Sequence, residues 1–494
     1  MNDSAHPEFQ IEPRILERAE HPVSRRDIDP RVLKVLYRLI DAGHTAYLVG
    51  GGVRDLMIGR RPKDFDVATS AHPHEVRELF RNSRLIGRRF RLVHVFFGQQ
   101  NIEVATFRRR AEDVAESDEP LIRHDNTFGT PVEDAFRRDF TINALFYNPR
   151  TFHVIDYTGG VADLQAGLIR TIGDPEVRMR EDPVRMLRAV RFAAKLGFEI
   201  EPATRAAIER HREDLRNSSV PRLVEEIYRA LGIPAAARAF ELMHELAMFD
   251  LLLPPLAQFL RAGAEPVADS ATGRCLAAMG RRIGEGVEPL HSLMLACLFA
   301  DLWKRGLPGG EKIDLPGDLR ARGFARGDTE RMRLVLEALP HLTVLSRRTR
   351  RLLSRPYFNE ARLLFEIIAS ASGADTGALE SFTADPEAWL EARGAAEPRQ
   401  ARPAGEATVP GRRRRRGRRG GRARRRWRNA RAAAGDIGAS HNGEKRAHQS
   451  GGDSSMAPQH GVATRAAASS EPAVIESAAA PAPDSADFSQ RSRG

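Results

Sequence analysis

The chain has 494 residues, 41% of them hydrophobic and 29% charged, which is enough for about three folded domains. Its formal net charge is +11, but residues 411–431 hold 13 Arg and no acid, so the rest of the chain sums to −2. Cys275 and Cys297 form no CxxC pair and no Cys/His cluster, which excludes a disulfide scaffold and a Cys-rich zinc module. Charges throughout the N-terminus exclude a secretory signal, and there is no run of about 18 apolar residues to span a membrane. We therefore expect a soluble cytoplasmic protein.

Residues 31–175 mix helical and strand patterns. A helical period covers residues 32–41. Residues 89–97 and 102–107 both alternate with period two and are joined by a Gly-Gln-Gln-Asn turn, which predicts a β-hairpin. The expected strands are 46–49, 64–69, 89–97, 102–107 and 153–157. We expect this segment to be one α+β domain with a mixed sheet of about five strands. Residues 1–30 are expected to be a flexible extension.

From Asp182 onward the pattern is helical. Asp182 is expected to cap a helix with Pro183 at its first position, and Gly197 to end it. Further helical patterns cover 203–216, 221–232, 234–249, 289–304, 328–338 and 359–371. We expect a helical neck at 176–260 and an all-α body at 261–400. Residues 401–494 contain no Leu and only two aromatic residues, so we expect them to be a disordered tail.

Two carboxylates lie close together in Asp64-Phe65-Asp66. On a strand, residues i and i+2 share a face, so both carboxylates would point one way while Phe65 and Val67 face the core. Like charges side by side repel unless a cation lies between them, and hard oxygen ligands suit Mg²⁺. An isolated DxD pair is equally typical of a solvated strand edge, so the pair alone decides little.

A glycine-rich turn precedes this pair. Gly50-Gly51-Gly52 follows a strand pattern and opens an expected helix, an arrangement that lets backbone N–H groups approach a phosphate. The turn is neither a P-loop nor GxGxxG, and a purely structural turn would look the same. The DxD pair begins nine residues after Asp55. The glycine turn and the pair together are a more specific signal than either one alone.

Four ordered motifs resemble those of the class II tRNA nucleotidyltransferase and poly(A) polymerase family. They are residues 48–55 with 63–67 (LVGGGVRD and KDFDV), 134–144 (DAFRRDFTINA), 156–164 (DYTGGVADL) and 181–192 (EDPVRMLRAVRF). The resemblance implies a polymerase-β-like nucleotidyltransferase head at 31–175. It also implies ATP as substrate and two Mg²⁺ ions, with Asp64 and Asp66 as metal ligands.

The resemblance also implies roles for other residues. A third carboxylate is expected to complete the catalytic set, and Glu103 and Asp139 both remain candidates. Asp182 and Arg185, neighbours at i and i+3, are expected to read the adenine base: a carboxylate accepts from its amino group and a guanidinium donates to a ring nitrogen. The remaining nucleotide-binding candidates are Gly51, Gly52, Arg54, Arg137, Arg138 and Arg188.

The family contains both poly(A) polymerases and CCA-adding enzymes, which share these motifs. Residues 85–95 (LIGRRFRLVHV) resemble the stretch that bacterial poly(A) polymerases carry, so we expect a template-independent polynucleotide adenylyltransferase. His94 on this stretch is expected to support the core or the base-reading residues. A CCA-adding enzyme is the first alternative. The second, of another class, is a catalytically silent RNA-binding protein, although binding alone has no need of the Asp64/Asp66 pair.

The Arg-rich part of the tail is expected to bind RNA phosphates without sequence preference, with Trp427 stacking on a base. Its candidate residues are Arg412, Arg413, Arg414, Arg415, Arg416, Arg418, Arg419, Arg424, Arg425, Arg426 and Trp427. The expected partners are RNA 3′ ends, from mRNA fragments and small RNAs, together with RNA-decay or RNA-chaperone proteins. We expect a monomer.

Overall fold

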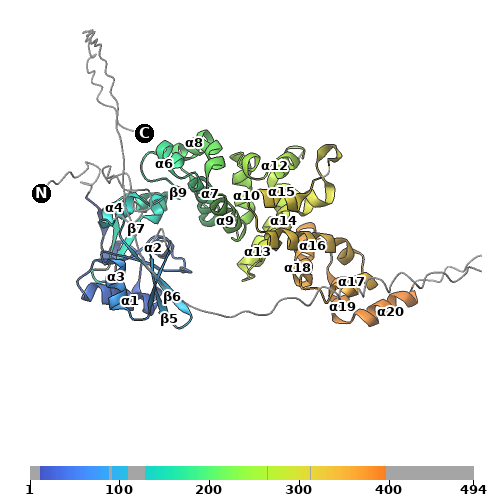
Figure 1. Ribbon diagram of the computed structural model, residues 1–494, viewed down its shortest axis with the longest axis horizontal. Coiled ribbons are helices and arrows are strands. Elements are labelled where there is room, and N and C mark those ends of the chain that lie inside the picture. The colour runs from blue at the N-terminus through green and yellow to red at the C-terminus, as the bar shows by residue number, and fades with distance from the viewer. Residues whose placement is uncertain (1–11, 88–91, 110–127, 264, 312, 397–494) are drawn as a thin grey trace, which may run out of the picture. The chain divides into compact units, whose positions relative to one another are not determined.

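The computed structural model describes residues 12–87, 92–109, 128–263, 265–311 and 313–396. Contacts within the chain separate residues 1–400 from residues 401–494, and the tail candidates Arg412 to Trp427 lie outside the described residues. In Figure 1 the sheet and its helices come first along the chain and a series of helices follows. Among the described helices, none combines the length and the apolar character needed to cross a lipid bilayer.

The head is built on one mixed sheet of eight strands, in the order β1-β8-β7-β2-β3-β6-β5-β4. β3 and β6 pair in parallel, and every other neighbouring pair is antiparallel. The strands are β1 Arg14–Leu16, β2 Ala46–Val49, β3 Asp66–Thr69, β4 Ser83–Ile86, β5 Leu92–Phe97, β6 Gln100–Thr106, β7 Leu145–Asn148 and β8 His153–Asp156.

The expectation of about five strands was therefore wrong, because three short strands were missed. β7 is a continuous apolar run buried between β2 and β8, so it lacks the alternation that marks a half-buried strand. β4 lies at an exposed edge, and β1 has only three residues. β1 also shows that the N-terminal segment is not wholly a loose extension, since Leu16 and Val23 are buried.

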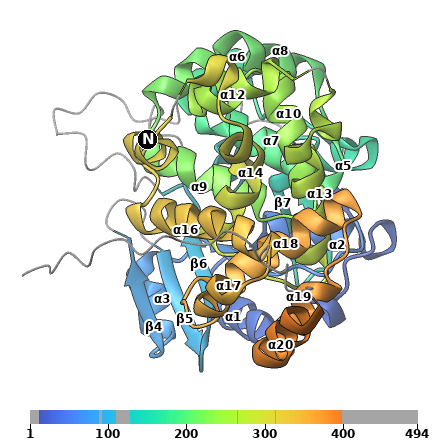
Figure 2. The same ribbon diagram turned by 90° about the vertical axis from the view of Figure 1, so that its right-hand side faces the viewer.

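Alternation along the central strands gives the sheet two packed faces. Leu48 and Val67 point into the main core, which they share with α1, while their neighbours Val49 and Ala68 belong to a smaller cluster around Phe146. The head helices are α1 Pro30–Asp41, α2 Gly51–Met57, α3 Pro73–Leu79, α4 Pro131–Phe136 and α5 Gly160–Ala166. Figure 2 shows α3 beside β4 and β5, and α1 contacts α3, β2 and β3.

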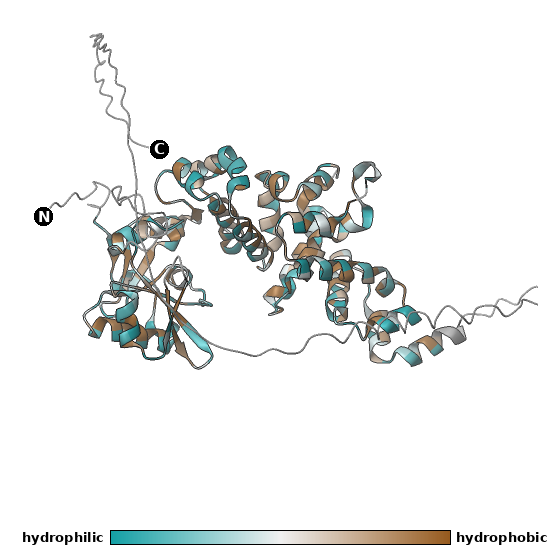
Figure 3. Ribbon diagram, in the orientation of Figure 1, coloured by the Kyte–Doolittle hydropathy of each residue, from teal (hydrophilic) through white to brown (hydrophobic). Residues whose placement is uncertain are grey.

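The rest of the described chain is almost entirely helical. A short parallel pair, β9 Leu168–Ile169 with β10 Glu199–Ile200, lies at its start. Apolar residues form stripes along the helices, which alternate between teal and brown in Figure 3. The helices are α6 Pro175–Glu181, α7 Val184–Leu196, α8 Pro202–His211, α9 Val220–Leu231, α10 Ala236–Glu245, α11 Phe249–Leu252, α12 Pro254–Arg261, α13 Ala271–Gly284, α14 His291–Arg305, α15 Leu315–Ala321, α16 Arg326–Thr343, α17 Arg347–Leu352, α18 Phe358–Ser372, α19 Gly377–Ala384 and α20 Pro386–Ala396.

The six helical segments expected after residue 200 are all present, with shifted ends. The expected cap of α7 was wrong in detail: Asp182 follows the last residue of α6, and Pro183 is the N-cap of α7. Gly197, in the left-handed conformation at φ +75°, ends α7 as expected.

Candidate active site

The first cluster of the site is a set of carboxylates at one edge of the central strands. Asp66 is the first residue of β3, and Asp64 lies in the loop before it rather than on the strand as expected. Val67 is fully buried and Phe65 packs partly against the core. Because β3 and β6 pair in parallel register, Asp66 lies directly beside Glu103.

The electrostatics of this cluster favour a cation. Although Asp66 is exposed at the start of β3, partial desolvation beside the strands, followed by the charges of Glu103 and Asp64, raises its pKa to about 6, and Arg138 opposes the shift. All three carboxylates line one cleft of about 1310 Å³. Carboxylates gathered at an open cleft fit a divalent metal ion, which would reduce their mutual repulsion.

Asp64 and Asp66 are therefore the residues that would hold a metal. The described residues contain no group of three or more His, Cys, Asp or Glu side chains close enough to form a complete protein-only site. Mg²⁺ usually takes one or two carboxylates plus substrate phosphates and water rather than a full protein cage. The donor set is suited to a metal that arrives with a nucleotide.

Glu103 is held by the strand on its other side. His94 of β5 pairs with it in register, and its Nε2 lies 3.3 Å from Glu103 Oε1. The other ring nitrogen of His94 lies 2.8 Å from the amide of Asn101. His94 is thus a neighbour of the carboxylate cluster rather than a core residue. Residues 88–91, within the 85–95 stretch, lie outside the described residues.

The glycine turn packs close to the acidic loop. Gly50 has a φ of +68°, and α2 begins at the next residue. A Cβ on Gly52 would lie 3.4 Å from the ring of Phe65, so Gly52 brings the start of α2 against the loop that carries Asp64. The first N–H groups of a helix have no partner within it.

Arg54 of α2 faces the interior. Its side chain is only 3% exposed, Nη1 donates to Asn143 Oδ1 at 2.6 Å, and Nε donates to Asp55 at 2.8 Å. The guanidinium also lies over the ring of Phe192 at 5.2 Å. The expected nucleotide-binding residue therefore braces the turn instead of facing either pocket.

A second pocket, of about 390 Å³, gathers the remaining candidates. It is lined by Arg137, Arg138, Asp139, Asp182, Val184, Arg185, Arg188, Arg222, Glu225, Glu226 and Arg229. Arg137 and Arg138 both bind the buried carboxylate of Asp134, at 2.6 and 2.8 Å. This shared anchor fixes the two guanidinium groups at the wall of the pocket.

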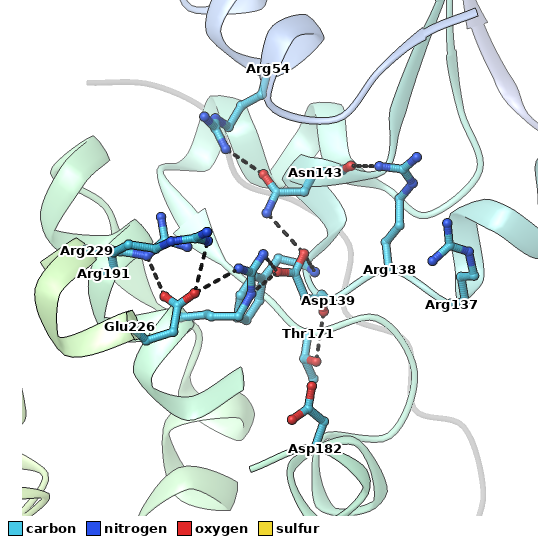
Figure 4. Close-up of polar contacts among 12 residues, drawn as sticks. Arg54, Arg137, Arg138, Asp139, Asn143, Thr171, Asp182, Arg191, Glu226 and Arg229 are labelled. Atoms are coloured by element: carbon cyan, nitrogen blue, oxygen red, sulfur yellow. Dashed lines mark hydrogen bonds and ion pairs between the residues drawn. The ribbon is translucent and has the colours of Figure 1, made fainter. Parts of the chain in front are cut away.

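Asp139 belongs to this second pocket and not to the carboxylate cluster. Its Oδ2 accepts from Arg188 Nε at 2.8 Å, and its Oδ1 accepts from the Phe140 N–H at 2.8 Å and from Asn143 at 3.1 Å. Burial alone would raise its pKa, but the Arg188 guanidinium and these hydrogen bonds lower the pKa of Asp139 to about 2. Figure 4 shows Asn143 linking Asp139 to Arg54.

Asp182 and Arg185 lie together at the rim of the second pocket, each with another partner. Asp182 accepts two hydrogen bonds from Arg222, at 2.9 and 2.7 Å, and Arg185 donates to Glu181 at 2.8 Å. A ligand that reads its base through Asp182 would therefore have to replace Arg222.

Three polar partners were missed in the sequence. Glu226 of α9 is 5% exposed and lies near Arg188, Arg191 and Arg229, at 3.2, 2.7 and 3.4 Å. The only signal was an acid on the apolar face of α9, whose neighbours Leu223, Val224 and Ile227 are buried. Asp134 lies in the motif 134–144 but was given no role there, and Arg222 carried no signal of its own.

The DYTGGVADL motif shapes the backbone. The Asp156 carboxylate accepts the N–H groups of Gly160 and Val161 at the start of α5. Asp163 accepts from the Thr141 hydroxyl at 2.7 Å. A Cβ on Gly160 would overlap the Thr141 carbonyl oxygen, so only glycine fits there.

Comparisons with known proteins agree with this arrangement. Residues 46–170 match a family model described as the poly A polymerase head domain, and residues 197–260 match one described as the probable RNA and SrmB- binding site of polymerase A. Poly(A) polymerase I of Salmonella typhi is 46% identical over 307 residues, which are 60% of this chain and 65% of that protein. Poly(A) polymerase I of Haemophilus influenzae is 38% identical over 308 residues, 61% of this chain and 67% of that protein. The chain thus spans just under two thirds of the Salmonella relative.

Among solved structures, the CCA-adding enzyme of Bacillus stearothermophilus in complex with CTP is similar, with a TM-score of 0.53 and 29% identity. The match covers 75% of this chain and 83% of that chain. A nucleotidyltransferase head followed by a helical part is therefore common to both proteins.

Proposed function

The chain belongs to the poly(A) polymerase family of nucleotidyltransferases, and on that premise we propose that it is a template-independent polynucleotide adenylyltransferase. It transfers AMP from ATP to the 3′ hydroxyl of RNA and releases pyrophosphate. The observation that carries the proposal is the carboxylate cluster of Asp64, Asp66 and Glu103, which opens onto a cleft of about 1310 Å³.

Each part of the site has a task in this reaction. Asp64 and Asp66 would hold two Mg²⁺ ions, and the bound ions would supply activation of the attacking hydroxyl and stabilisation of the triphosphate charge. Glu103 is the third carboxylate, because it lies beside Asp66 in the sheet, whereas Asp139 already binds Arg188. Gly51 and Gly52 let the backbone approach the phosphates.

The second pocket selects the base. Asp182 accepts from the adenine amino group and Arg185 donates to the neighbouring ring nitrogen. Arg137, Arg138 and Arg188 surround the same pocket, where they contact the ribose or the phosphates. Arg54 acts from behind, through Asn143, by holding the glycine turn in place.

The proposed function also includes the acceptor RNA, the cellular compartment and the partners of the protein. RNA 3′ ends of mRNA fragments and small RNAs are the acceptors, and the Arg-rich segment 411–431 holds them by their phosphates. The protein works as a cytoplasmic monomer alongside RNA-decay or RNA-chaperone proteins. Cys275 and Cys297 are both buried and free although their thiols are hydrogen-bonded neighbours, and reduced thiols suit that compartment.

Primer extension tests the proposal. A short unstructured RNA is incubated with Mg²⁺ and each single nucleotide, and long tails from ATP alone are expected. Addition of only C, C and A to a truncated tRNA would identify a CCA-adding enzyme instead. RNA binding without extension of either substrate would identify a silent binding protein.

Substitutions in the same assay test the residues. Asp64→Ala and Asp66→Ala should abolish extension while RNA binding stays nearly unchanged. Glu103→Gln should lower kcat far more than Asp139→Asn if Glu103 is the third carboxylate, and the reverse order would reject that assignment. Asp182→Ala should reduce the preference for ATP over CTP, and unchanged selectivity would reject its role in reading the base.

A further inference from the structure

A stacked pair of aromatic rings lies on the helical side of the large cleft. Tyr228 of α9 and His291, the first residue of α14, have ring centroids 3.8 Å apart and planes only 5° apart. Phe324 meets the Tyr228 ring edge-on at 5.7 Å. The pair therefore joins two helices that are more than 50 residues apart in the sequence.

One carboxylate fixes the orientation of both rings. The Tyr228 hydroxyl donates to Asp328 Oδ2 at 3.2 Å, and His291 Nδ1 lies 3.3 Å from the same oxygen. Two rings held by a shared acceptor lose little further freedom when a third ring stacks on them, which favours binding.

The two rings differ in exposure. Tyr228 is 7% exposed, whereas the His291 side chain is 53% exposed although one of its faces is covered by Tyr228. Because His291 also lines the cleft, its uncovered part is available to a planar group inside the cleft. A purely structural link between α9 and α14 would not need this exposed ring.

The other residues that line the cleft indicate which ligand would contact the His291 ring. Asp64, Asp66 and Glu103 line the same cleft, so an RNA strand must enter it to bring its 3′ hydroxyl to these carboxylates. Lys63, an exposed residue next to Asp64, lines it as well and supplies positive charge for a phosphate backbone. The adenine of ATP belongs to the second pocket, which His291 does not line.

We propose that His291, supported from behind by Tyr228, is a stacking platform for one nucleobase of the RNA primer, upstream of its 3′ end. Stacking accepts every base, because each has a π-face, as suits an enzyme that extends many RNAs. The proposal rests on the proposed function and deepens it, since His291 lies outside the matched RNA-binding segment 197–260.

Binding of abasic primers to the whole protein tests this platform. A series of fluorescent oligo(A) primers carries one abasic nucleotide at successive positions from the 3′ end, and Kd is measured by anisotropy without ATP. In the wild-type protein one position should raise Kd by roughly 5- to 100-fold. In His291→Ala, the intact primer should already bind that much more weakly, and the abasic nucleotide at that position should add nothing.

Two further variants separate stacking from folding. His291→Phe keeps a flat ring and should retain the wild-type profile, while His74→Ala, at an exposed histidine of α3, should leave the profile unchanged. An identical abasic profile in wild type and His291→Ala would overturn the platform. Because these measurements need no turnover, a protein that shows the His291-dependent profile but adds no AMP would refute the proposed function alone.

Discussion

Asp66 is the residue at which the metal and a proton compete. Its pKa of about 6 means that the protonated form prevails below that pH, and a metal needs the ionised form. We expect the Kd for Mg²⁺, measured by calorimetry, to rise about tenfold for each pH unit below about 6. Asp41→Asn, an exposed carboxylate of α1, should behave as wild type. An affinity for Mg²⁺ that stays the same when the pH falls below about 6 would contradict the assignment of Asp66 as a metal ligand.

Asp139 has the opposite shift and a role in stability. Its pKa is about 2 in the folded protein, against 3.8 for an ordinary aspartate, so its ionised form stabilises the fold above about pH 4. This contribution is lost as the pH falls toward 2. Asp139→Asn should therefore lower the free energy of unfolding by about 2 kcal/mol at pH 7. The deficit should shrink between pH 4 and pH 2 in urea titrations, and a pH-independent deficit would argue against the ion pair with Arg188.

The sequence was informative about which residues carry chemistry and uninformative about their partners. Asp64 and Asp66 stand out because a DxD pair follows a glycine turn within a few residues. Glu226 and Arg222 did not stand out, and Asn143 was part of a motif without a role, because their partners Arg191, Asp182 and Arg54 lie 35 to 89 residues away. Such contacts depend on how elements pack, which local spacing does not encode.

At the scale of elements, Glu226 ties α9 to α7. Removing it would leave the buried Arg191 without its acceptor, so Glu226→Ala should cost about 3–5 kcal/mol of stability. Glu225, next to it on α9, is 57% exposed and pairs only with Arg229 among the described contacts. Glu225→Ala should cost less than about 1 kcal/mol. Thermal unfolding of the two variants checks this, and equal effects would show that the buried network does not hold the helices together.

The start of α5 offers a test of the glycine motif. Gly160→Ala places a methyl group against the Thr141 carbonyl oxygen and should destabilise the protein by about 1–3 kcal/mol. Gly284, the last residue of α13, has open space around its Cβ position. Gly284→Ala should leave stability unchanged or raise it by up to about 1 kcal/mol. A harmless Gly160→Ala variant would mean that the turn is free to move.

Helices and strands were predicted more reliably where their hydrophobic pattern repeats clearly along the sequence. Most of the long amphipathic helices were found with shifted ends, because their apolar stripe recurs over several turns, but α13 was not predicted. The strands β1, β4 and β7 were missed because β1 has only three residues, β4 is an exposed edge strand and β7 is an apolar run without alternation. Asp64 was placed on a strand for the same reason, although the strand begins two residues later.

At the scale of the whole chain, charge divides the molecule into two parts with different expected tasks. The residues outside 411–431 are close to charge balance, and 13 Arg lie within that segment. Recognition of ATP is assigned to specific side chains in the second pocket, whereas an arginine segment binds phosphates of any sequence. The two tasks should therefore be separable by truncation.

Removal of residues 401–494 should weaken RNA binding and flatten its dependence on salt, while extension at saturating RNA stays intact. The slope of log K against log salt should become shallower by about 0.7 for each phosphate of a single strand that the protein no longer neutralises. Replacing the 13 Arg of residues 411–431 with Lys in the full-length protein keeps the charge and should preserve both affinity and slope, whereas replacement with Gln should reproduce the truncation. A truncated protein that cannot extend saturating RNA would place the tail within the active site, because chemistry would then require it beyond holding the strand.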